Sequence, residues 1–422
     1  MTTLVYSLTI LCLLLPIYVY IGYPLLLWLL SITVKPRIVH RANTTPQTTL
    51  LVSCYNEAEV IREKLDNCLS IDYPSNKLEI IFISDGSDDG TDEIIKEYEN
   101  KGIRLIRQEG RLGKTSGLNH GVAASSAEIV IFTDANAMFD PQAVRMLVRN
   151  FNDPEVGYVV GAALYTDGDN NSAAKSENVY WKYEIFMKQI ETQLHSVVGG
   201  DGAIYAIRRA LYEPLQQQDI NDFVNPLQII AKGYRGIFDS EAKCYEETAG
   251  DFDKEGLRKQ RIVNRSFRGL MRVKEVLNPF KFGFYSLEII SHKLLRWLIP
   301  AFILGIVFGS IFLAQQGLAQ FQLLVMLEAI FLWLAIIGYF KSKNRSTSPV
   351  FYYPYYFLLV NYHSLLGIIQ ALKGNIQVTW SSSRKQANQT STSKEKAMLL
   401  TAILIIFSIY LFIDSAISLL TG

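Results

Sequence analysis

AEIVIFTDANAMFD, residues 127–140, is the stretch that decides the fold. Its apolar run, 129–132, lies between turn signals, which is typical of a strand buried on both faces of a parallel sheet. Asp134 and Asn136 follow at a spacing of two, so in an extended chain their side chains face the same side. In open α/β sheets, ligands bind beyond the carboxyl ends of the strands. The stretch therefore predicts a binding edge that begins at Asp134.

Three similar stretches precede this one. They read TLLVSC (49–54), LEIIFISD (78–85) and IRLIRQ (103–108). Helical stretches are expected to begin near residues 57, 91, 116 and 141. This alternation predicts a doubly wound, Rossmann-like α/β domain over residues 48–250. Each strand ends in polar residues, so four polar strand ends are expected to meet at one edge.

Composition restricts the class of protein. The chain has 422 residues, a net charge of +1 and a hydrophobic share of 49%, which is more than a soluble enzyme needs. The near-neutral charge argues against a nucleic-acid partner. The cysteines show neither metal-ligand spacing nor a disulfide framework; they are Cys12, Cys54, Cys68 and Cys244. We therefore expect a membrane protein with reduced thiols.

Hydropathy predicts a transmembrane helix within residues 1–34. Residues 4–31 carry no charge and are long enough to span a bilayer, and Pro16 and Pro24 predict a kink. A cleaved signal peptide is the alternative, but its apolar region would be shorter and would end in small residues. The stretch is followed directly by three basic residues, Lys35, Arg37 and Arg41. The positive-inside rule then places this flank in the cytoplasm and the N-terminus outside.

Apolar segments return in residues 297–422. Three of them are expected to cross the membrane: 297–314, 321–340 and 397–420. Segment 351–372 has positive charge on both sides and begins with Tyr and Pro, so we predict an interfacial or re-entrant helix. Glu328 is either a functional carboxyl in the membrane or a hydrogen-bonded or protonated one. The expected location is the plasma (inner) membrane, with the α/β domain in the cytoplasm.

The region before these segments is strongly basic. Residues 251–274 contain eight Lys and Arg against three Asp and Glu. This pattern predicts amphipathic helices over 251–296 that lie on anionic lipid head groups.

A nucleotide suits the polar strand ends. GRLGKT, residues 110–115, suggests a P-loop, but that motif needs a glycine at position 108, which is Gln108. No GxGxxG follows the first strand, which disfavours a nicotinamide or flavin cofactor. What remains is a nucleotide held by acidic and polar loops. Arg111 and Lys114 would lie near its phosphates, and an Asp would carry a divalent cation.

An ordered set of motifs resembles the membrane-embedded family 2 glycosyltransferases, which include hyaluronan, cellulose and poly-N-acetylglucosamine synthases. The resemblance covers almost all of the chain, including the flanking membrane segments. Its motifs are SCYNE (53–57), SDGSDDGT (84–91), GRLGKTSGLNHG (110–121), TDANAMFD (133–140), VGGDGAIYAIRR (198–209) and NDFVNPLQIIAKGYRGIF (221–238). It implies a GT-A fold with a doubly wound mixed sheet, a UDP-sugar donor and inversion at the anomeric carbon.

The resemblance also implies the residues of the donor site. Tyr55, Asn56 and Glu57 resemble the loop that packs on uracil and ribose, and Asp85 resembles the carboxylate that hydrogen-bonds the uracil.

Asp134 and Asn136 match the Asp-x-Asp motif that holds Mg²⁺ or Mn²⁺ on the diphosphate of the donor. The neutral Asn136 is a departure that removes one charge from the metal site, although an amide oxygen still coordinates a hard cation. The alternative is that the pair forms only a turn or a helix cap before Pro141.

Inverting transfer needs a general base that takes the proton of the acceptor hydroxyl. Asp222 occupies the place of the aspartate in the family's Glu-Asp motif, with Asn221 replacing the Glu. Asp222 is therefore the expected base; the alternative is that it caps the helix that follows. Gly200, Asp201 and Gly202 resemble the acceptor-binding segment.

Polymerising members carry Gln-x-x-Arg-Trp in the basic region. The nearest match is RKQRI, in which Ile262 replaces the Trp. Arg258, Gln260 and Arg261 would keep the contact with the diphosphate, whereas the aromatic platform for the acceptor is absent.

Trp380 and Arg384 resemble an element that closes over the donor in some synthases; the alternative is that the Trp anchors a helix in the interface.

The expected function is therefore a membrane-integral, metal-dependent inverting glycosyltransferase that elongates a cell-surface or extracellular polysaccharide. Its partners would be a UDP-sugar, a glycan or lipid-linked acceptor, and membrane lipids. One alternative is a single sugar transfer to a lipid carrier. The other is a degenerate transferase domain that serves as a binding or scaffold protein.

Overall fold

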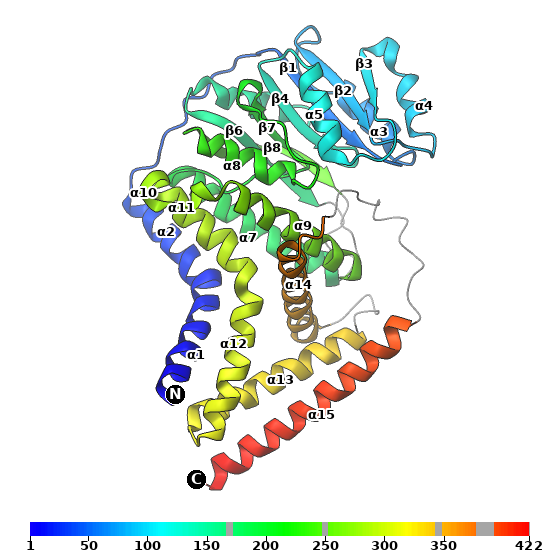
Figure 1. Cartoon of the computed structure of the whole chain (residues 1–422). Coiled ribbons are helices and arrows are strands. Elements are labelled where there is room, and N and C mark those ends of the chain that lie inside the picture. The colour runs from blue at the N-terminus through cyan, green and yellow to red at the C-terminus, as the bar shows by residue number, and fades with distance from the viewer. Residues whose placement is uncertain (166–171, 247–251, 342–347, 377–391, 422) are drawn as a thin grey trace.

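An α/β domain lies above a group of long helices (Figure 1). The computed structural model describes residues 1–165, 172–246, 252–341, 348–376 and 392–421. The predictions for Trp380 and Arg384 lie outside the described residues.

The first half of the sheet is parallel, as the sequence predicts. It consists of β1 (Thr48–Cys54), β2 (Leu78–Ser84), β3 (Ile103–Arg107) and β4 (Ile129–Asp134). These strands lie side by side in the order β3-β2-β1-β4. Every residue of β1 is buried, which explains why its apolar residues do not alternate with polar ones. Asp134 lies in register with Ser53, so both strands end at the same edge.

The second half of the sheet is mixed. β7 (Tyr205–Arg208) is antiparallel to β4, and β6 (Val156–Tyr165) is antiparallel to β7. β8 (Arg235–Glu246) is parallel to β6 and antiparallel to the short β5 (Met138–Phe139). The alternation of stretches alone would give a sheet of purely parallel strands. This holds for β1–β4 but not for the second half of the sheet.

Helices cover both faces of the sheet. Four of them begin close to the predicted positions: α3 (Ile61–Leu69), α4 (Thr91–Lys96), α5 (Lys114–Ala124) and α6 (Ala143–Val148). α3, α4 and α6 share one apolar cluster with alternate residues of the strands, and α5 joins the cluster on the other face. A Cβ atom on Gly117 would lie 2.6 Å from Ile83 Cγ2, so the glycine lets α5 pack closely on the sheet.

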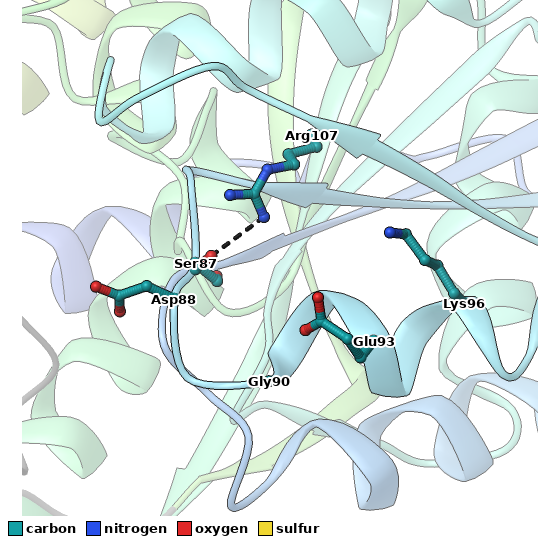
Figure 2. A pocket seen from close by; sticks show the side chains of 6 residues that line it. All are labelled: Ser87, Asp88, Gly90, Glu93, Lys96 and Arg107. Atoms are coloured by element: carbon teal, nitrogen blue, oxygen red, sulfur yellow. Dashed lines mark hydrogen bonds between the residues drawn. The ribbon is translucent and has the colours of Figure 1, made fainter.

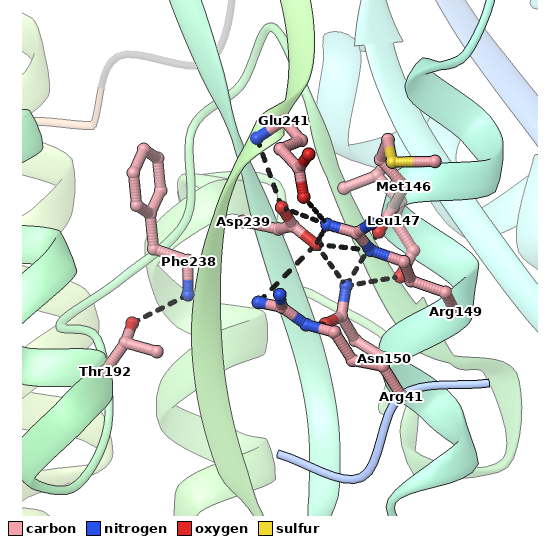
Figure 3. A network of polar contacts seen from close by, with 9 residues as sticks. All are labelled: Arg41, Met146, Leu147, Arg149, Asn150, Thr192, Phe238, Asp239 and Glu241. Carbon is pink, nitrogen blue, oxygen red and sulfur yellow. Dashed lines mark hydrogen bonds and ion pairs between the residues drawn. The ribbon is translucent and has the colours of Figure 1, made fainter. Parts of the chain in front are cut away.

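The segment that joins the N-terminal helix to the sheet is fixed by a polar network (Figure 3). Arg41 Nε donates to Asn150 Oδ1 at 2.8 Å, and its Nη2 lies 3.8 Å from Asp239 Oδ2. Asp239 is buried and also accepts from Arg149 and from Asn150 Nδ2. Arg41, which the sequence assigns to the flank of the membrane helix, thus binds the α/β domain.

In the described part of the chain, three helices are long and apolar enough to cross a membrane: Thr2–Thr33, Phe284–Gln315 and Ala319–Lys341. They overlap three of the predicted crossings, although the second begins at Phe284, within the region 251–296 that is predicted to lie at the interface. The fourth, 397–420, falls in α15 (Thr392–Thr421), of which the described apolar part is Ile406–Leu420. The N-terminus, the turn between α12 (Leu295–Gln315) and α13 (Ala319–Lys341), and the C-terminus all lie at the end farthest from the sheet (Figure 1).

Segment 351–372 forms most of α14 (Pro349–Leu372), which packs between α13 and the basic helix α9 (Phe252–Arg272). Glu328 on α13 accepts hydrogen bonds from Ser310 Oγ at 3.0 and 3.2 Å, which agrees with the hydrogen-bonded alternative for this carboxyl.

The first two apolar helices each contain a π-helical turn. Thr2–Thr33 is built from α1 (Thr2–Ile17), η1 (Tyr18–Gly22) and α2 (Tyr23–Thr33). The π turn lies between Pro16 and Pro24, and its wider spacing lets the helix continue past the missing N–H donors. In Phe284–Gln315, η6 (Ile290–Leu294) connects α11 (Phe284–Ile289) to α12. Tyr18 and Ser291 join the two π turns by a hydrogen bond of 2.8 Å.

A buried carboxylate connects these helices to the α/β domain. Glu191, on α7 (Ser172–Leu194), is fully buried. Its Oε1 accepts from Tyr23 OH at 3.1 Å and lies 2.5 Å from His292 Nδ1. Its Oε2 accepts from the backbone N–H of Val198 at 3.3 Å. One side chain thus binds both apolar helices and the loop that leads to Gly200.

Candidate active site

The loops that follow β1 and β2 are tied together. Asn56 has a left-handed backbone with φ of 54°, a conformation that asparagine adopts more readily than most residues. Its Nδ2 donates to Asp88 Oδ1 at 2.7 Å, and its Oδ1 accepts from Asp88 N at 3.0 Å. Glu57 N donates to Thr91 Oγ1 at 2.9 Å. These bonds fix the loop that carries Tyr55, Asn56 and Glu57.

Arg111, in the loop that follows β3, packs against this loop. Its guanidinium carbon is 3.8 Å from the centre of the Tyr55 ring, a cation–π arrangement. The sequence analysis places both Arg111 and Lys114 near the phosphates of a nucleotide. In the structure Lys114 lies beside Asp134, whereas Arg111 lies with the predicted uracil-binding loop.

Asp85 organises the neighbouring loop. It is buried, and its Oδ1 accepts from Gln108 Nε2 at 2.8 Å and from the backbone N–H groups of Leu112 and Gly113, both at 2.9 Å. Its Oδ2 has no hydrogen-bond partner among the described residues. Burial raises the pKa of Asp85 above the usual aspartate value. One oxygen therefore shapes the loop before Lys114, and the other can accept a hydrogen bond from a ligand.

A pocket of about 580 Å³ lies beside the same loops (Figure 2). It is lined by Ser87, Asp88, Gly90, Glu93, Lys96 and Arg107. Arg107 Nη1 donates to the carbonyl of Ser87 at 3.1 Å and pairs with the buried Asp92. The lining does not include Asp134 or Asp222. This pocket therefore lies beside the β2–α4 loop and does not contain the predicted reaction centre.

The predicted reaction centre forms around Gly202. Lys114 Nζ pairs with Asp134 Oδ1. A Cβ atom on Gly202 would lie 3.4 Å from Asp222 Oδ2, 3.7 Å from Asp134 Oδ2 and 3.8 Å from Lys114 Nζ. Three charged groups from different segments thus converge on a position without a side chain. The space left by this glycine is where a ligand would meet all three groups.

Asp222 lies in the first turn of α8 (Asn221–Ala231) but does not cap it. The N-cap residue is Ile220, and no side chain caps this end of the helix. Asp222 Oδ1 is buried and has no hydrogen-bond partner among the described residues. Burial raises the pKa of Asp222, and the Lys114 ammonium opposes this rise. A half-buried carboxylate whose buried oxygen has no partner among the described residues is suited to accept a proton, and capping does not explain it.

The segment 200–202 is held against Asp222. Gly200 N donates to the Asp222 carbonyl at 2.5 Å. Asp201 is buried, and its Oδ2 lies 3.3 Å from Lys188 Nζ of α7. The predicted acceptor segment and the predicted base are therefore neighbours.

Helix α9 brings arginines to the same region. Burial lowers the pKa of Arg261, while the carboxylates of Asp134 and Asp222 act in the opposite direction. Arg258 pairs with Glu255 at 3.4 Å.

Gln260, which is predicted to contact the diphosphate, contacts α14 in the structure. It is buried, and its Oε1 lies 3.0 Å from His363 Nδ1 of α14. One face of α9 is thus covered by protein, in addition to any contact of the helix with lipid head groups.

Glu246 also lies near the predicted reaction centre, although no motif in the sequence points to it. It is the last residue of β8, and burial together with Asp134 and Asp201 raises its pKa to about 7. Arg258 and Lys114 partly oppose this shift. Its position at the end of a strand could have indicated this location, but the sequence pattern does not identify β8 as a strand.

The oxygen donors at this edge fit a hard cation. Asp134 keeps its Oδ2 near Gly202, and Asn136 lies in the exposed turn that follows β4. Mg²⁺ and Mn²⁺ prefer such carboxylate and amide oxygens. No group of three or more His, Cys, Asp or Glu in the described residues is arranged to hold a metal alone. Mg²⁺ is usually bound by one or two carboxylates together with the phosphates of a ligand, which fits a site with few protein oxygens such as Asp134 and Asn136.

Known proteins resemble the chain in sequence. Residues 49–215 match the family model described as "Glycosyl transferase family 2". A poly-beta-1,6-N-acetyl-D-glucosamine synthase of Staphylococcus epidermidis is 37% identical over 115 residues, 27% of each chain. The enzyme of the same name from Staphylococcus aureus (strain COL) is 30% identical over 224 residues, 51% of this chain and 52% of the relative. The match thus spans about half the length of that relative.

A solved structure resembles the fold. The mannosyltransferase PcManGT from Pyrobaculum calidifontis, in complex with GDP-Man and Mn²⁺, superposes with a TM-score of 0.67 at 21% identity. The match covers 86% of this chain and 99% of that one. The likeness confirms the predicted GT-A fold with its mixed sheet. Residues 49–215 therefore form a family 2 glycosyltransferase domain, in a chain that also carries three helices long and apolar enough to cross a membrane.

Proposed function

We propose that the protein is a membrane-integral inverting glycosyltransferase that transfers a hexose or N-acetylhexosamine from a UDP-sugar to a growing polysaccharide. The convergence of Asp222, Asp134 and Lys114 on Gly202 carries the proposal. It provides a base, a cation-binding carboxylate and a fixed positive charge at one point. The names of the staphylococcal relatives support an N-acetylhexosamine and a polymeric product.

In this proposal Asp222 takes the proton of the acceptor hydroxyl while that oxygen attacks the anomeric carbon from the face opposite the UDP. Lys114 and Arg261, which lie near Asp134 and Asp222, would stabilise the negative charge of the diphosphate as it leaves. Asp134 and Asn136 would hold Mg²⁺ or Mn²⁺, which when bound neutralises charge on the diphosphate. Tyr55, Asn56, Glu57 and the Asp85 loop would hold the uridine.

Ile262 gives a specific reason to keep a second candidate, a single transfer to a lipid carrier. A growing chain must be held after each transfer, and an aromatic face is the usual platform for a sugar ring. Ile262 offers apolar contact without that geometry, and it is only partly buried on α9. We therefore expect short or moderately long polymers.

The test is to supply labelled UDP-N-acetylglucosamine to the protein in lipid vesicles and to size the products. We expect species longer than one added sugar, and none from the Asp222→Asn variant in the same vesicles. A product that never exceeds one sugar and extracts wholly into organic solvent would contradict the synthase and leave the lipid-acceptor transferase. A parallel screen of UDP- and GDP-sugars, read as nucleotide release, identifies the donor.

We further propose that the α/β domain faces the cytoplasm and that α14 does not cross the membrane. Gln316, between α12 and α13, and Lys373, at the end of α14, are both exposed. In a Cys12→Ala background, an impermeant maleimide should label Gln316→Cys in intact cells but Lys373→Cys only after permeabilisation. Labelling of Lys373→Cys from outside would make α14 a true crossing and refute the four-crossing topology.

A further inference from the structure

Lys64 is a fully buried lysine that the proposed mechanism does not use. It projects from α3 into the core beneath the sheet edge. Its Nζ donates to the carbonyl of Ala137, lies 3.4 Å from Thr133 Oγ1 and sits 4.6 Å from the centre of the Phe139 ring. Burial lowers its pKa. Because a buried ammonium is costly unless it is paired, its placement calls for a reason.

Asn67 binds the same segment from the next turn of α3. Its Nδ2 donates to the Phe139 carbonyl at 2.8 Å, and its Oδ1 accepts from the Phe139 N–H at 2.8 Å. Lys64 and Asn67 are three residues apart, so they lie on one face of the helix. Together they hold the backbone of residues 137–139, directly after the Asp134–Asn136 turn.

The turn is therefore fixed at three places. On the side of the site, Lys114 pairs with Asp134. At the strand end, Ala135 N donates to the Ser53 carbonyl at 3.2 Å. On the core side, Lys64 and Asn67 hold the backbone that follows. Without Lys64, the Ala137 carbonyl would lose its buried donor, and the turn would lose its anchor on the core side.

We propose that Lys64 is a positioning residue, which together with Asn67 sets the conformation of the Asp134–Asn136 turn for cation and diphosphate binding. The binding step rests on the proposed function; the fixing of the turn does not. Supporting residues of this kind orient the groups that bind a metal, and their loss typically lowers metal affinity by about 10- to 100-fold.

Lys64→Met tests the inference, because methionine has a similar length but cannot donate. The matched control is Lys77→Met. Lys77 Nζ donates to the Thr45 carbonyl at 2.8 Å next to the opposite, amino end of β2. We expect Lys64→Met to speed hydrogen exchange in residues 134–139 by at least about tenfold and to weaken Mn²⁺ binding in the presence of UDP by about 10- to 100-fold. Lys77→Met should change neither.

Each outcome decides the question. Exchange and Mn²⁺ affinity equal to those of Lys77→Met would overturn the proposal, as would faster exchange spread evenly over the domain. If Lys64→Met does not fold, Asn67→Ala takes its place and should release the Phe139 amide. If the native protein binds no Mn²⁺ with UDP while residues 134–139 still loosen in Lys64→Met, the proposed function fails and the positioning of the turn stands.

Discussion

Asp222→Asn is expected to lower turnover by about 10²–10⁴-fold while leaving the affinity for the UDP-sugar nearly unchanged, the usual result when a positioned base is lost. Asparagine keeps the size of the side chain but cannot take a proton. The buried Oδ1 has no partner among the described residues, so the substitution breaks no hydrogen bond of that atom. The native enzyme should also lose turnover as acid protonates Asp222, and the variant should lack this dependence.

The measurement is initial rate against donor concentration, together with calorimetric binding of the UDP-sugar. Asp66→Asn is a suitable control, because Asp66 accepts a hydrogen bond from Tyr98 on the surface of α3 and should not affect the rate. Binding and turnover that fall by the same factor in Asp222→Asn would show that the residue holds the donor and is not the base.

Asp134→Ala is expected to abolish both donor binding and turnover, with a loss of affinity of at least about 100-fold. Asp134 supplies the negative charge in the Asp-x-Asn motif, since Asn136 is neutral. Its loss would also leave Lys114, whose side chain is only 17% exposed, without its ion-pair partner. Calorimetry with UDP-sugar and Mn²⁺ measures the first effect, and nucleotide release measures the second.

Asn136→Asp is the matched variant for this site. It restores the second carboxylate of the motif and should tighten Mn²⁺ binding, because affinity for hard cations rises with the charge of the ligands. Full activity of the native protein in excess EDTA would contradict the proposed dependence on a cation.

Sequence reasoning located the parallel half of the sheet because those strands are buried on both faces and read as continuous apolar runs. It also placed Asp134, Lys114 and Gly202 in motifs that the structure brings to one point. The family resemblance implied a mixed sheet, but the individual strands of the mixed half were not visible in the sequence, because β7 has four residues and β8 carries polar residues along much of its length.

The features of the site that the sequence did not show have a common physical origin. Position along a helix does not show which neighbour covers each face, so the contact of Gln260 with α14 could not be foreseen. Lys64 looks in sequence like an ordinary surface lysine of an amphipathic helix. Glu246 reaches the site from a strand more than 100 residues after Asp134. Such contacts depend on tertiary packing, which local patterns do not encode.

The contacts of Glu191 determine how the chain can be divided. A soluble fragment cut near residues 48 and 246 would retain Glu191 but lack Tyr23 and His292, which cover and bind its carboxylate. The carboxylate would then keep only the Val198 amide, next to the segment that carries Gly200. The predicted boundaries near residues 48 and 250 therefore separate Glu191 from two of its partners. Biochemistry on this enzyme should use the intact chain in detergent or lipid.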